Sequence, residues 1–246
     1  MVDDMDTDEM AVDADTIKNL GSTQDEEVIL YAIWESTITF NTDGGSSVSS
    51  ISGIIGSAVS TTPINPTKTG YTFASWDKEI PSTMPAENIT VYAKWTVNQY
   101  TINFNTNEGT VIAPITQDYA TEVTAPAIPS KVGHTFAGWY SDEACTKAYT
   151  FTSMPAANTT VYAKWTINSY TINFVVNGGS AVESIKQNYA TAVTQPANPT
   201  KVGYTFTGWY KDAECTETYE FTTMPAEDVT VYVGWVINQY TITLDT

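Results

Sequence analysis

The sequence predicts a mainly β protein, built as a tandem array of three small β-rich units with partial units at both ends. The first observation is a repeat: the segment at 91–95 recurs at 161–165 and 231–235, so the closing tryptophans stand seventy residues apart. The second is an alternation: the runs at 100–104 and 170–174 place apolar residues at every second position, as in a half-buried strand. We therefore expect each unit to fold as a small sheet.

The repeat period divides the chain into six segments. The first complete unit lacks seven residues that the next two units carry between a tryptophan and a methionine. Because the pattern is interrupted at both ends, we expect the chain to be a segment of a longer protein. The predicted segments are an acidic leader (1–27), the closing strand of a partial unit (28–36), repeat 1 (37–98), repeat 2 (99–168), repeat 3 (169–238) and the opening strand of a partial unit (239–246).

Repeats 2 and 3 predict the same order of elements. A turn with glycine, such as Glu108-Gly109, follows the opening strand, and we expect this turn to supply the positive φ that lets the chain return as a hairpin to a strand near Tyr119 or Tyr189. The proline-punctuated crossover at 126–133 predicts one short helical turn that ends at glycine. A short strand is expected at 148–151, before the closing strand of the unit.

Large aromatic side chains are the predicted core of each unit. Units of this size lie near the lower limit for independent folding, so they have to bury their largest rings. Tyr140 and Tyr210 are the expected exposed contact residues. The predicted core residues are Trp34, Phe73, Trp76, Trp95, Phe104, Phe136, Trp139, Trp165, Phe174, Phe206, Trp209 and Trp235.

The junctions between units contain neither glycine nor proline. The stretch 91–104 runs from a closing strand into the next opening strand, and its residues favour β structure throughout. Neighbouring units are therefore expected to be joined by nearly continuous extended chain instead of a flexible linker. This pattern predicts an elongated, semi-rigid rod.

The charge distribution excludes nucleic acid as a partner class. The formal net charge is −18, and residues 1–27 hold ten acids against a single lysine. Arginine is absent and the lysines are scattered, so no basic stripe is available to neutralise phosphates. An anionic membrane surface would repel the chain, and no apolar run is long enough for a transmembrane helix. The start of the chain also lacks the pattern of a secretory signal.

The acidic leader carries a weak resemblance to a calcium-binding loop. Asp4, Asp6, Asp8 and Asp15 stand at positions 1, 3, 5 and 12 of such a loop. However, Glu9 occupies the position where the sharp turn needs glycine. A solvated acidic tail is the favoured interpretation, and we expect neither a metal nor a cofactor.

Comparison between the units argues against catalysis. His134 is the single histidine, and tyrosine replaces it at 71 and 204, so it is interpreted as an aromatic strand position and not as a general base. We therefore predict no catalytic residue. Cys145 and Cys215 occupy equivalent places one unit apart, whereas a disulfide needs Cα atoms within about 7 Å. Free thiols are expected, with links between molecules as an open alternative.

These motifs resemble the Listeria/Bacteroides repeat, the family of the internalin B-repeat. The resemblance rests on Tyr-Thr-Ile-x-Phe, Gly-Gly, Pro-x-Lys-x-Gly-Tyr-x-Phe-x-Gly-Trp-Tyr and Thr-Val-Tyr-Ala-x-Trp, in this order. It implies a small β-grasp-like unit that occurs in tandem on bacterial surface and secreted proteins, as a spacer or contact module and not as a catalyst. The shortened repeat 1 and the acidic leader depart from the family pattern.

Three functions follow as hypotheses. The first is a non-enzymatic spacer or adhesion region of an extracellular or cell-surface protein, whose partner is a protein, a cell surface or another copy of itself. The second is a filament subunit joined head to tail by terminal strands. The third is an accessory segment of a secreted hydrolase. The predicted assembly strands carry Val28, Leu30, Ala32 and Trp34 at one end and Tyr240, Ile242 and Leu244 at the other.

Overall fold

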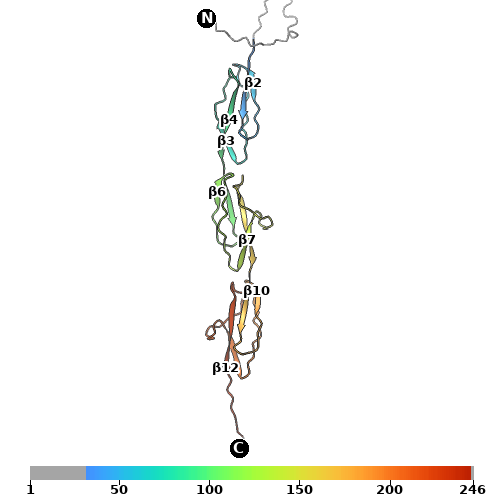
Figure 1. Ribbon diagram of the computed structural model, residues 1–246, viewed down its shortest axis with the longest axis vertical. Helices are drawn as coiled ribbons and strands as arrows, with labels where there is room; N and C mark the ends of the chain where they lie inside the picture. Colours follow the sequence, from blue (N-terminus) through green and yellow to red (C-terminus); the bar gives the residue numbers. More distant parts are fainter. Residues whose placement is uncertain (1–31, 245–246) are drawn as a thin grey trace, which may run out of the picture. The chain divides into compact units, whose positions relative to one another are not determined.

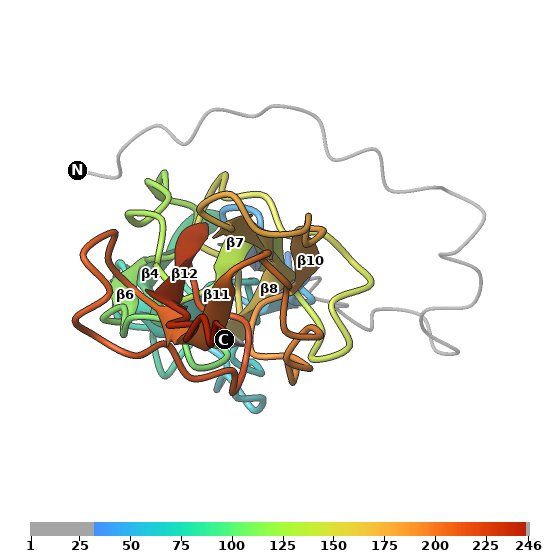
Figure 2. The ribbon, with the colours of Figure 1, turned by 90° about the horizontal axis from the view of Figure 1, so that it is seen from below.

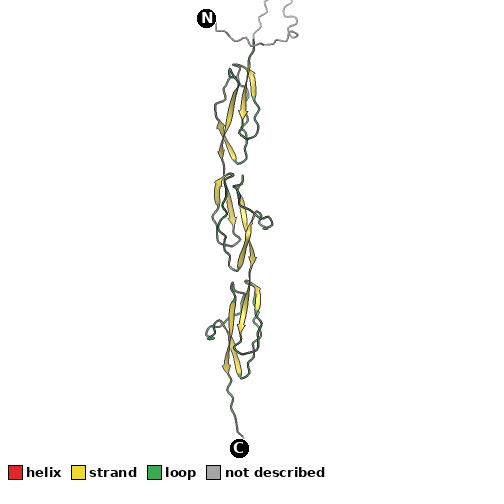
Figure 3. Ribbon diagram, viewed as in Figure 1, coloured by secondary structure: helices red, strands yellow, loops and turns green. Residues whose placement is uncertain are grey.

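A computed structural model describes residues 32–244 of the chain. Over this range the chain forms β-strands and no helix, as the yellow arrows and green loops of Figure 3 show. The strands are β1 (Glu35–Asn41), β2 (Ile51–Ile54), β3 (Tyr71–Trp76), β4 (Ile89–Val97), β5 (Gln99–Asn105), β6 (Ile115–Asp118), β7 (His134–Tyr140), β8 (Thr159–Ile167), β9 (Ser169–Val175), β10 (Ile185–Asn188), β11 (Tyr204–Tyr210) and β12 (Val229–Ile237).

The chain divides into two compact units, and some of their strands, such as β2 and β7, are labelled in Figure 1. The described part of unit 1 is residues 32–67 and Phe73–Trp95, which make up most of repeat 1. Unit 2 contains Lys68–Thr72 and everything from residue 96 onward, and it holds repeats 2 and 3. The elongated rod expected from the sequence stays a prediction.

Each repeat forms one four-stranded mixed sheet with the same strand order. In repeat 2 the order is β6-β5-β8-β7, with β5 and β8 parallel and the two outer pairs antiparallel. Repeats 1 and 3 have the equivalent orders β2-β1-β4-β3 and β10-β9-β12-β11. Figure 2 shows strands of these sheets, among them β7, β8 and β11, in a second view. The prediction of three small β-rich units is therefore confirmed.

The core of repeat 2 lies between its sheet and the connecting loops. Ile102 and Val161 from the two central strands are fully buried, and Val123 and Met154 from the loops pack against them. Repeat 3 has the same arrangement. Among the predicted core residues, Trp139 and Trp209 are buried. Seven others pack against the three cores and are partly exposed: Trp76, Phe104, Phe136, Trp165, Phe174, Phe206 and Trp235.

Trp34 differs from the other predicted core residues. Its side chain is 61% exposed, so it is not a core residue of the described structure. Phe73 and Trp95 in repeat 1 are partly buried, and their rings contact each other with centroids 5.7 Å apart. Trp34 directly precedes β1 and is in no strand, whereas its counterparts Trp95, Trp165 and Trp235 lie within β4, β8 and β12.

A β-bulge places two aromatic residues of β7 on the core side of the sheet. Phe136 and Trp139 are three residues apart, and in a regular strand they would face opposite sides. The pairing register with β8 shifts between Phe136 and Gly138, where Gly138 has a φ of 124°. As a result the two rings contact each other at 5.4 Å and share one hydrophobic cluster.

Several sequence-based boundaries need correction. No helix forms at 126–133, where residues 126–130 have no regular structure and a turn lies at 132–133. Of the expected strand at 148–151, only Ala148 makes a β-bridge, to Tyr140. Residues 35 and 36 belong to repeat 1, because both pair with β2. Residues 240–244 form no strand, and the predicted strand residues Val28 and Leu30 lie outside the described range.

Candidate functional site

The junction between repeats 2 and 3 is a single residue, Asn168, that hydrogen-bonds to both repeats. Its backbone N–H donates to the Gly133 carbonyl at 2.9 Å, and its own carbonyl accepts from the Tyr189 N–H at 2.8 Å. Its side-chain oxygen accepts from the Thr135 hydroxyl at 2.7 Å, and its side-chain nitrogen donates to the Tyr170 hydroxyl at 3.2 Å. Four hydrogen bonds therefore restrain the residue that connects β8 to β9.

An aromatic contact also lies at the junction between repeats 2 and 3. The ring of Tyr189 packs directly on Gly133, so closely that a Cβ on this glycine would overlap the ring carbons. Gly133 also has a φ of 68°, so two independent constraints favour glycine here. The His134 ring meets Tyr189 edge to face at 6.0 Å, in agreement with its predicted role as an aromatic strand position.

The arrangement recurs around Asn98 in unit 2. The Asn98 N–H donates to the Gly70 carbonyl at 2.9 Å, and the Asn98 carbonyl accepts from the Tyr119 N–H at 2.8 Å. Tyr119 packs on Gly70, and its ring lies 5.9 Å from that of Tyr71. We call this combination of asparagine, glycine and hairpin tyrosine the junction motif.

The asparagine and glycine of the junction motif recur at Asn238 and Gly203, without a packed tyrosine. The Asn238 N–H donates to the Gly203 carbonyl at 2.9 Å, and Thr205 donates to the Asn238 side chain at 2.6 Å. Within residues 32–244, no atom lies within 4 Å of the place that a Cβ on Gly203 would occupy. The glycine and asparagine positions are therefore arranged alike whether or not a tyrosine packs on them.

The junctions and the repeated sheets agree with a known family of repeats. Residues 37–94, 100–164 and 170–233 each match the Listeria-Bacteroides repeat domain. The chain belongs to the Listeria-Bacteroides repeat family. These three matches coincide with the three sheets, and the residues between them include Asn98 and Asn168 of the junction motif.

Longer bacterial proteins contain similar segments. The chain is 40% identical over 231 residues to a candidate membrane protein of Evansella cellulosilytica, covering 88% of this chain and 34% of that protein. It is 38% identical over 234 residues to a candidate Gly-rich membrane protein of the same organism, covering 90% and 27%. Internalin H of Listeria monocytogenes is 35% identical over 168 residues, covering 58% and 30%. The chain thus spans about a third of the length of these relatives.

Listeria-Bacteroides repeats 2 and 3 each carry a cysteine loop that repeat 1 lacks. Cys145 and Cys215 are free and partly buried, and both have positive φ. Burial raises the pKa of the Cys215 thiol, and the nearby charges of Asp212 and Glu214 raise it further. This thiol is therefore protonated near neutral pH and is a poor nucleophile.

Aspartates organise these cysteine loops. The carboxylate of Asp142 accepts hydrogen bonds from the Thr146 N–H, the Lys147 N–H and the Thr146 hydroxyl, and Asp212 does the same in repeat 3. The backbone hydrogen bond from Lys147, followed by that from Thr146, lowers the pKa of Asp142. These carboxylates act as structural acceptors that hold the loop closed.

The two predicted contact tyrosines have different surroundings. The Lys164 ammonium lies 4.9 Å from the centre of the Tyr140 ring and donates to the Cys145 carbonyl at 3.2 Å. In repeat 3 the equivalent of this lysine is Gly234, and Tyr210 lines an open cleft of about 450 Å³. Both tyrosines are partly buried, which corrects the expectation that they are exposed, and their role as contact residues stays a prediction.

No metal site or membrane-spanning helix is present in the described part of the chain. No group of three or more His, Cys, Asp or Glu side chains between residues 32 and 244 could hold a metal ion. The same residues include no helix that is long and apolar enough to cross a bilayer. The weak calcium-loop candidates Asp4, Asp6, Asp8 and Asp15 lie outside the described residues.

Asn88 and Asn158 show a structural role that the sequence did not reveal. The Asn158 side chain accepts from the Thr101 N–H at 2.9 Å, and Asn88 accepts from the Thr37 N–H at 2.8 Å. Asp228 makes the equivalent bond to Thr171 in repeat 3. Because an aspartate serves equally well, the side-chain oxygen is what this position requires.

Proposed function

We propose that this chain is a non-enzymatic spacer region of a bacterial surface or secreted protein, which holds other parts of that protein at a defined separation. The observation that carries the proposal is the junction motif. The hydrogen bonds that Asn168 makes to the elements on both sides leave little freedom for repeats 2 and 3 to rotate relative to each other. A spacer needs this property, whereas an enzyme would not need it at every repeat.

The relatives support the surface location. Two are named as candidate membrane proteins, and the third is an internalin. Their sequences extend well beyond the region that matches this chain. An array of Listeria-Bacteroides repeats within a longer surface protein would separate the functional domains of that protein from the membrane or the wall.

The surroundings of the reactive side chains support a non-enzymatic role. The single histidine packs edge to face on a tyrosine, and its Nδ1 lies 2.8 Å from the Val132 carbonyl. The Cys215 thiol has a raised pKa, and Asp142 and Asp212 are used as loop acceptors. Each of these groups is explained by a structural role, so no general base or activated nucleophile is available from them.

The native cysteines allow a direct test of the spacer. Cys145 and Cys215 occupy equivalent positions in repeats 2 and 3, so spin labels on both report the distance between these repeats. We expect a narrow distance distribution by double electron–electron resonance, and a broader one after Tyr189→Ala. Tyr189→Phe is the matched control, because it keeps the ring on Gly133. A broad distribution in the unmodified chain would reject the spacer proposal.

A further inference from the structure

The cleft of repeat 3 lies where repeat 2 holds the end of a lysine side chain. In repeat 2 the Lys164 ammonium lies over the Tyr140 ring, 4.9 Å from its centre, and donates to the Cys145 carbonyl at 3.2 Å. In repeat 3 the position of this lysine is a glycine. That glycine lines the cleft of about 450 Å³ together with the counterparts of the tyrosine and the cysteine, namely Gly234, Tyr210 and Cys215.

The loop that carries the cysteine folds alike in both repeats. The cysteine N–H donates to the carbonyl of the aspartate three residues earlier, at 2.9 Å in repeat 2 and 3.2 Å in repeat 3. The φ angles of Cys145 and Cys215 are 51° and 57°. Within residues 32–244, the Cys215 carbonyl accepts no hydrogen bond. Repeat 3 therefore keeps the acceptor that binds an ammonium in repeat 2, and it lacks the donor.

The closing strand of repeat 3 cannot supply this donor. A Cβ on Gly234 would overlap the Tyr210 ring and the Thr207 hydroxyl, so the path that the Lys164 side chain takes in repeat 2 is occupied. Thr207 itself replaces Ala137 of repeat 2. A cation that uses the tyrosine ring and the cysteine carbonyl of repeat 3 has to enter the cleft from solvent.

The charges around the cleft favour a cation. In repeat 2, residues 141–147 hold two acids and one lysine, and Lys164 brings their sum to zero. In repeat 3, residues 211–217 hold three acids and one lysine, and the position of Lys164 is uncharged, so the same set carries a charge of −2. One of these acids, Glu214, lines the cleft.

Lys201 also lines the cleft, but it is bound at a different acceptor. Its Nζ donates to the Asn177 carbonyl at 2.8 Å and lies 4.2 Å from the centre of the Tyr204 ring. Lys131 makes the equivalent hydrogen bond in repeat 2, at 3.0 Å, and Lys164 is present in the same repeat. The fold of one repeat thus accommodates both ammonium groups.

A following repeat leaves this place open. Repeat 2 is followed by repeat 3, whose Tyr189 ring packs on Gly133. The Lys164 side chain nevertheless remains exposed to solvent while its ammonium contacts the ring and the carbonyl. The cleft of repeat 3 therefore follows from the glycine at 234 and not from its place in the array.

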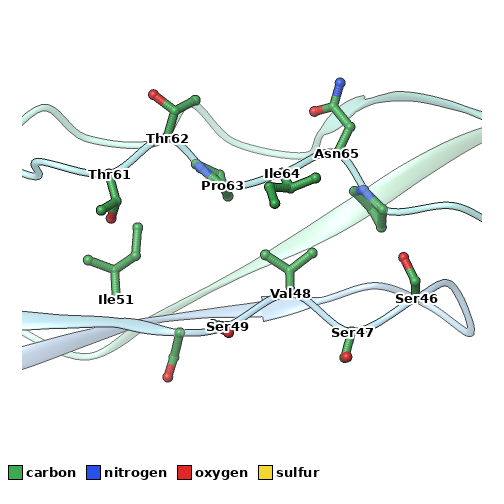
Figure 4. Close-up of a pocket in the computed structure, with 12 residues that line it drawn as sticks. Ser46, Ser47, Val48, Ser49, Ile51, Thr61, Thr62, Pro63, Ile64 and Asn65 are labelled. Atoms are coloured by element: carbon green, nitrogen blue, oxygen red, sulfur yellow. The ribbon is translucent and has the colours of Figure 1, made fainter.

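A cleft of similar volume in repeat 1 has a different chemistry. It measures about 440 Å³ and runs between residues 46–51 and 61–66, and in Figure 4 the side chains of Val48 and Ile51 point toward the opposite segment. None of its lining residues is charged. The cleft of repeat 3 differs because it combines an aromatic ring, an unused carbonyl and a carboxylate.

We propose that the cleft of repeat 3 binds a primary alkylammonium group, as at the end of a lysine side chain or of an aliphatic amine. The ammonium lies over the Tyr210 ring and donates to the Cys215 carbonyl, as Lys164 does within repeat 2, and Glu214 supplies the opposite charge. This binding is independent of the spacer function, which requires no ligand.

An NMR titration of the full chain with n-butylammonium chloride tests the site. Saturable shifts of the Cys215 and Gly234 amides are expected, and sodium chloride at the same concentration is the control for ionic strength. Thr207→Ala combined with Gly234→Lys rebuilds the residues of repeat 2, so an internal ammonium should abolish the saturable shifts. Glu214→Ala, which also introduces the residue of repeat 2, should weaken binding about two- to fivefold, as expected for an exposed ion pair.

Two further probes separate the charge from its source. Nα-acetyl-lysine amide should shift the same amides, whereas its Nε-acetylated form, which has no charge, should not. Tighter binding of the lysine amide than of butylammonium would identify a lysine side chain as the ligand, and equal binding would identify free amines. The proposal is wrong if the parent chain shows no saturable shift, if the Nε-acetylated probe binds equally well, or if Glu214→Ala and the double variant both bind butylammonium as the parent does.

Discussion

The indole ring of Trp165 packs directly against Gly109, and no side chain could stand between them. A Cβ on Gly109 would lie 2.5 Å from the ring carbon Cζ2 of Trp165. The same indole donates its Nε1–H to the Thr106 carbonyl at 2.9 Å, which fixes the ring on the hairpin loop. Trp95 and Trp235 make the same contacts with Gly45 and Gly179. The closing tryptophan and the second turn glycine therefore form one structural unit in every repeat.

Replacement of this glycine is expected to destabilise repeat 2 strongly. Gly109→Ala forces the indole away from the loop, and overpacking of this kind costs about 1–3 kcal/mol. Urea denaturation followed by tryptophan fluorescence would show a lower midpoint. Glu108→Ala is the control: this neighbour has a φ of 67° and an exposed ion pair with Lys131, so its loss should change stability by less than about 0.5 kcal/mol. Equal midpoints for the two variants would contradict the assignment.

The glycine pair illustrates what the sequence could and could not predict. The turn itself follows from composition, because Gly-Gly between two alternating runs is a strong hairpin signal. The different roles of the two turn positions do not follow from composition. Positive φ belongs to the first position, where repeat 2 uses Glu108, and the second glycine is needed for the approach of a tryptophan about fifty residues away in the sequence. A contact over this distance leaves no local signal.

The same limit applies to the sheet and to the junctions. The alternation of apolar and polar residues predicted the opening and closing strands. The parallel pairing of β5 with β8 depends on the crossover between them, and the sequence of that crossover has no periodic pattern from which its course could be predicted. The bulge at Gly138 could be suspected from a glycine inside a strand pattern. The packing of Tyr189 on Gly133 joins two repeats, and the repeat alignment alone showed only that both residues recur.

Removal of the Tyr189 ring is expected to loosen the junction locally. Tyr189→Ala removes an aromatic side chain from Gly133, and burial of a side chain of this size contributes about 1.5–3 kcal/mol. Because 1.4 kcal/mol corresponds to a factor of ten, the Asn168 and Tyr189 amides should exchange with solvent at least about tenfold faster. Hydrogen exchange followed by NMR measures this directly. Tyr189→Phe should keep the parental rates, and equal rates in the Ala variant would show that the ring does not restrain the junction.

The cysteine loop of repeat 2 should respond to acid through Asp142. Its pKa is lowered from 3.8 in the folded chain, first by the Lys147 N–H and then by the Thr146 N–H. A carboxylate with a depressed folded pKa stabilises the loop above the unfolded value, and this contribution is lost as the pH falls through the folded pKa. The Thr146 and Lys147 amide resonances should therefore titrate with a midpoint below 3.8. Asp142→Asn should abolish that titration, and a midpoint above 3.8 would contradict the hydrogen-bonded geometry.

The Cys215 thiol is expected to alkylate slowly at neutral pH. Its pKa is raised above 9.0, first by burial and then by the negative charges of Asp212 and Glu214. Because the thiolate is the reactive form, the rate of reaction with iodoacetamide should rise with pH through a midpoint above 9.0. Cys145→Ser isolates this thiol for the measurement, and Glu214→Gln should move the midpoint down because it removes one of the charges. A midpoint below 9.0 in the Cys145→Ser chain would mean that the loop activates the thiol, and the structural interpretation of the cysteine loops would then have to be abandoned.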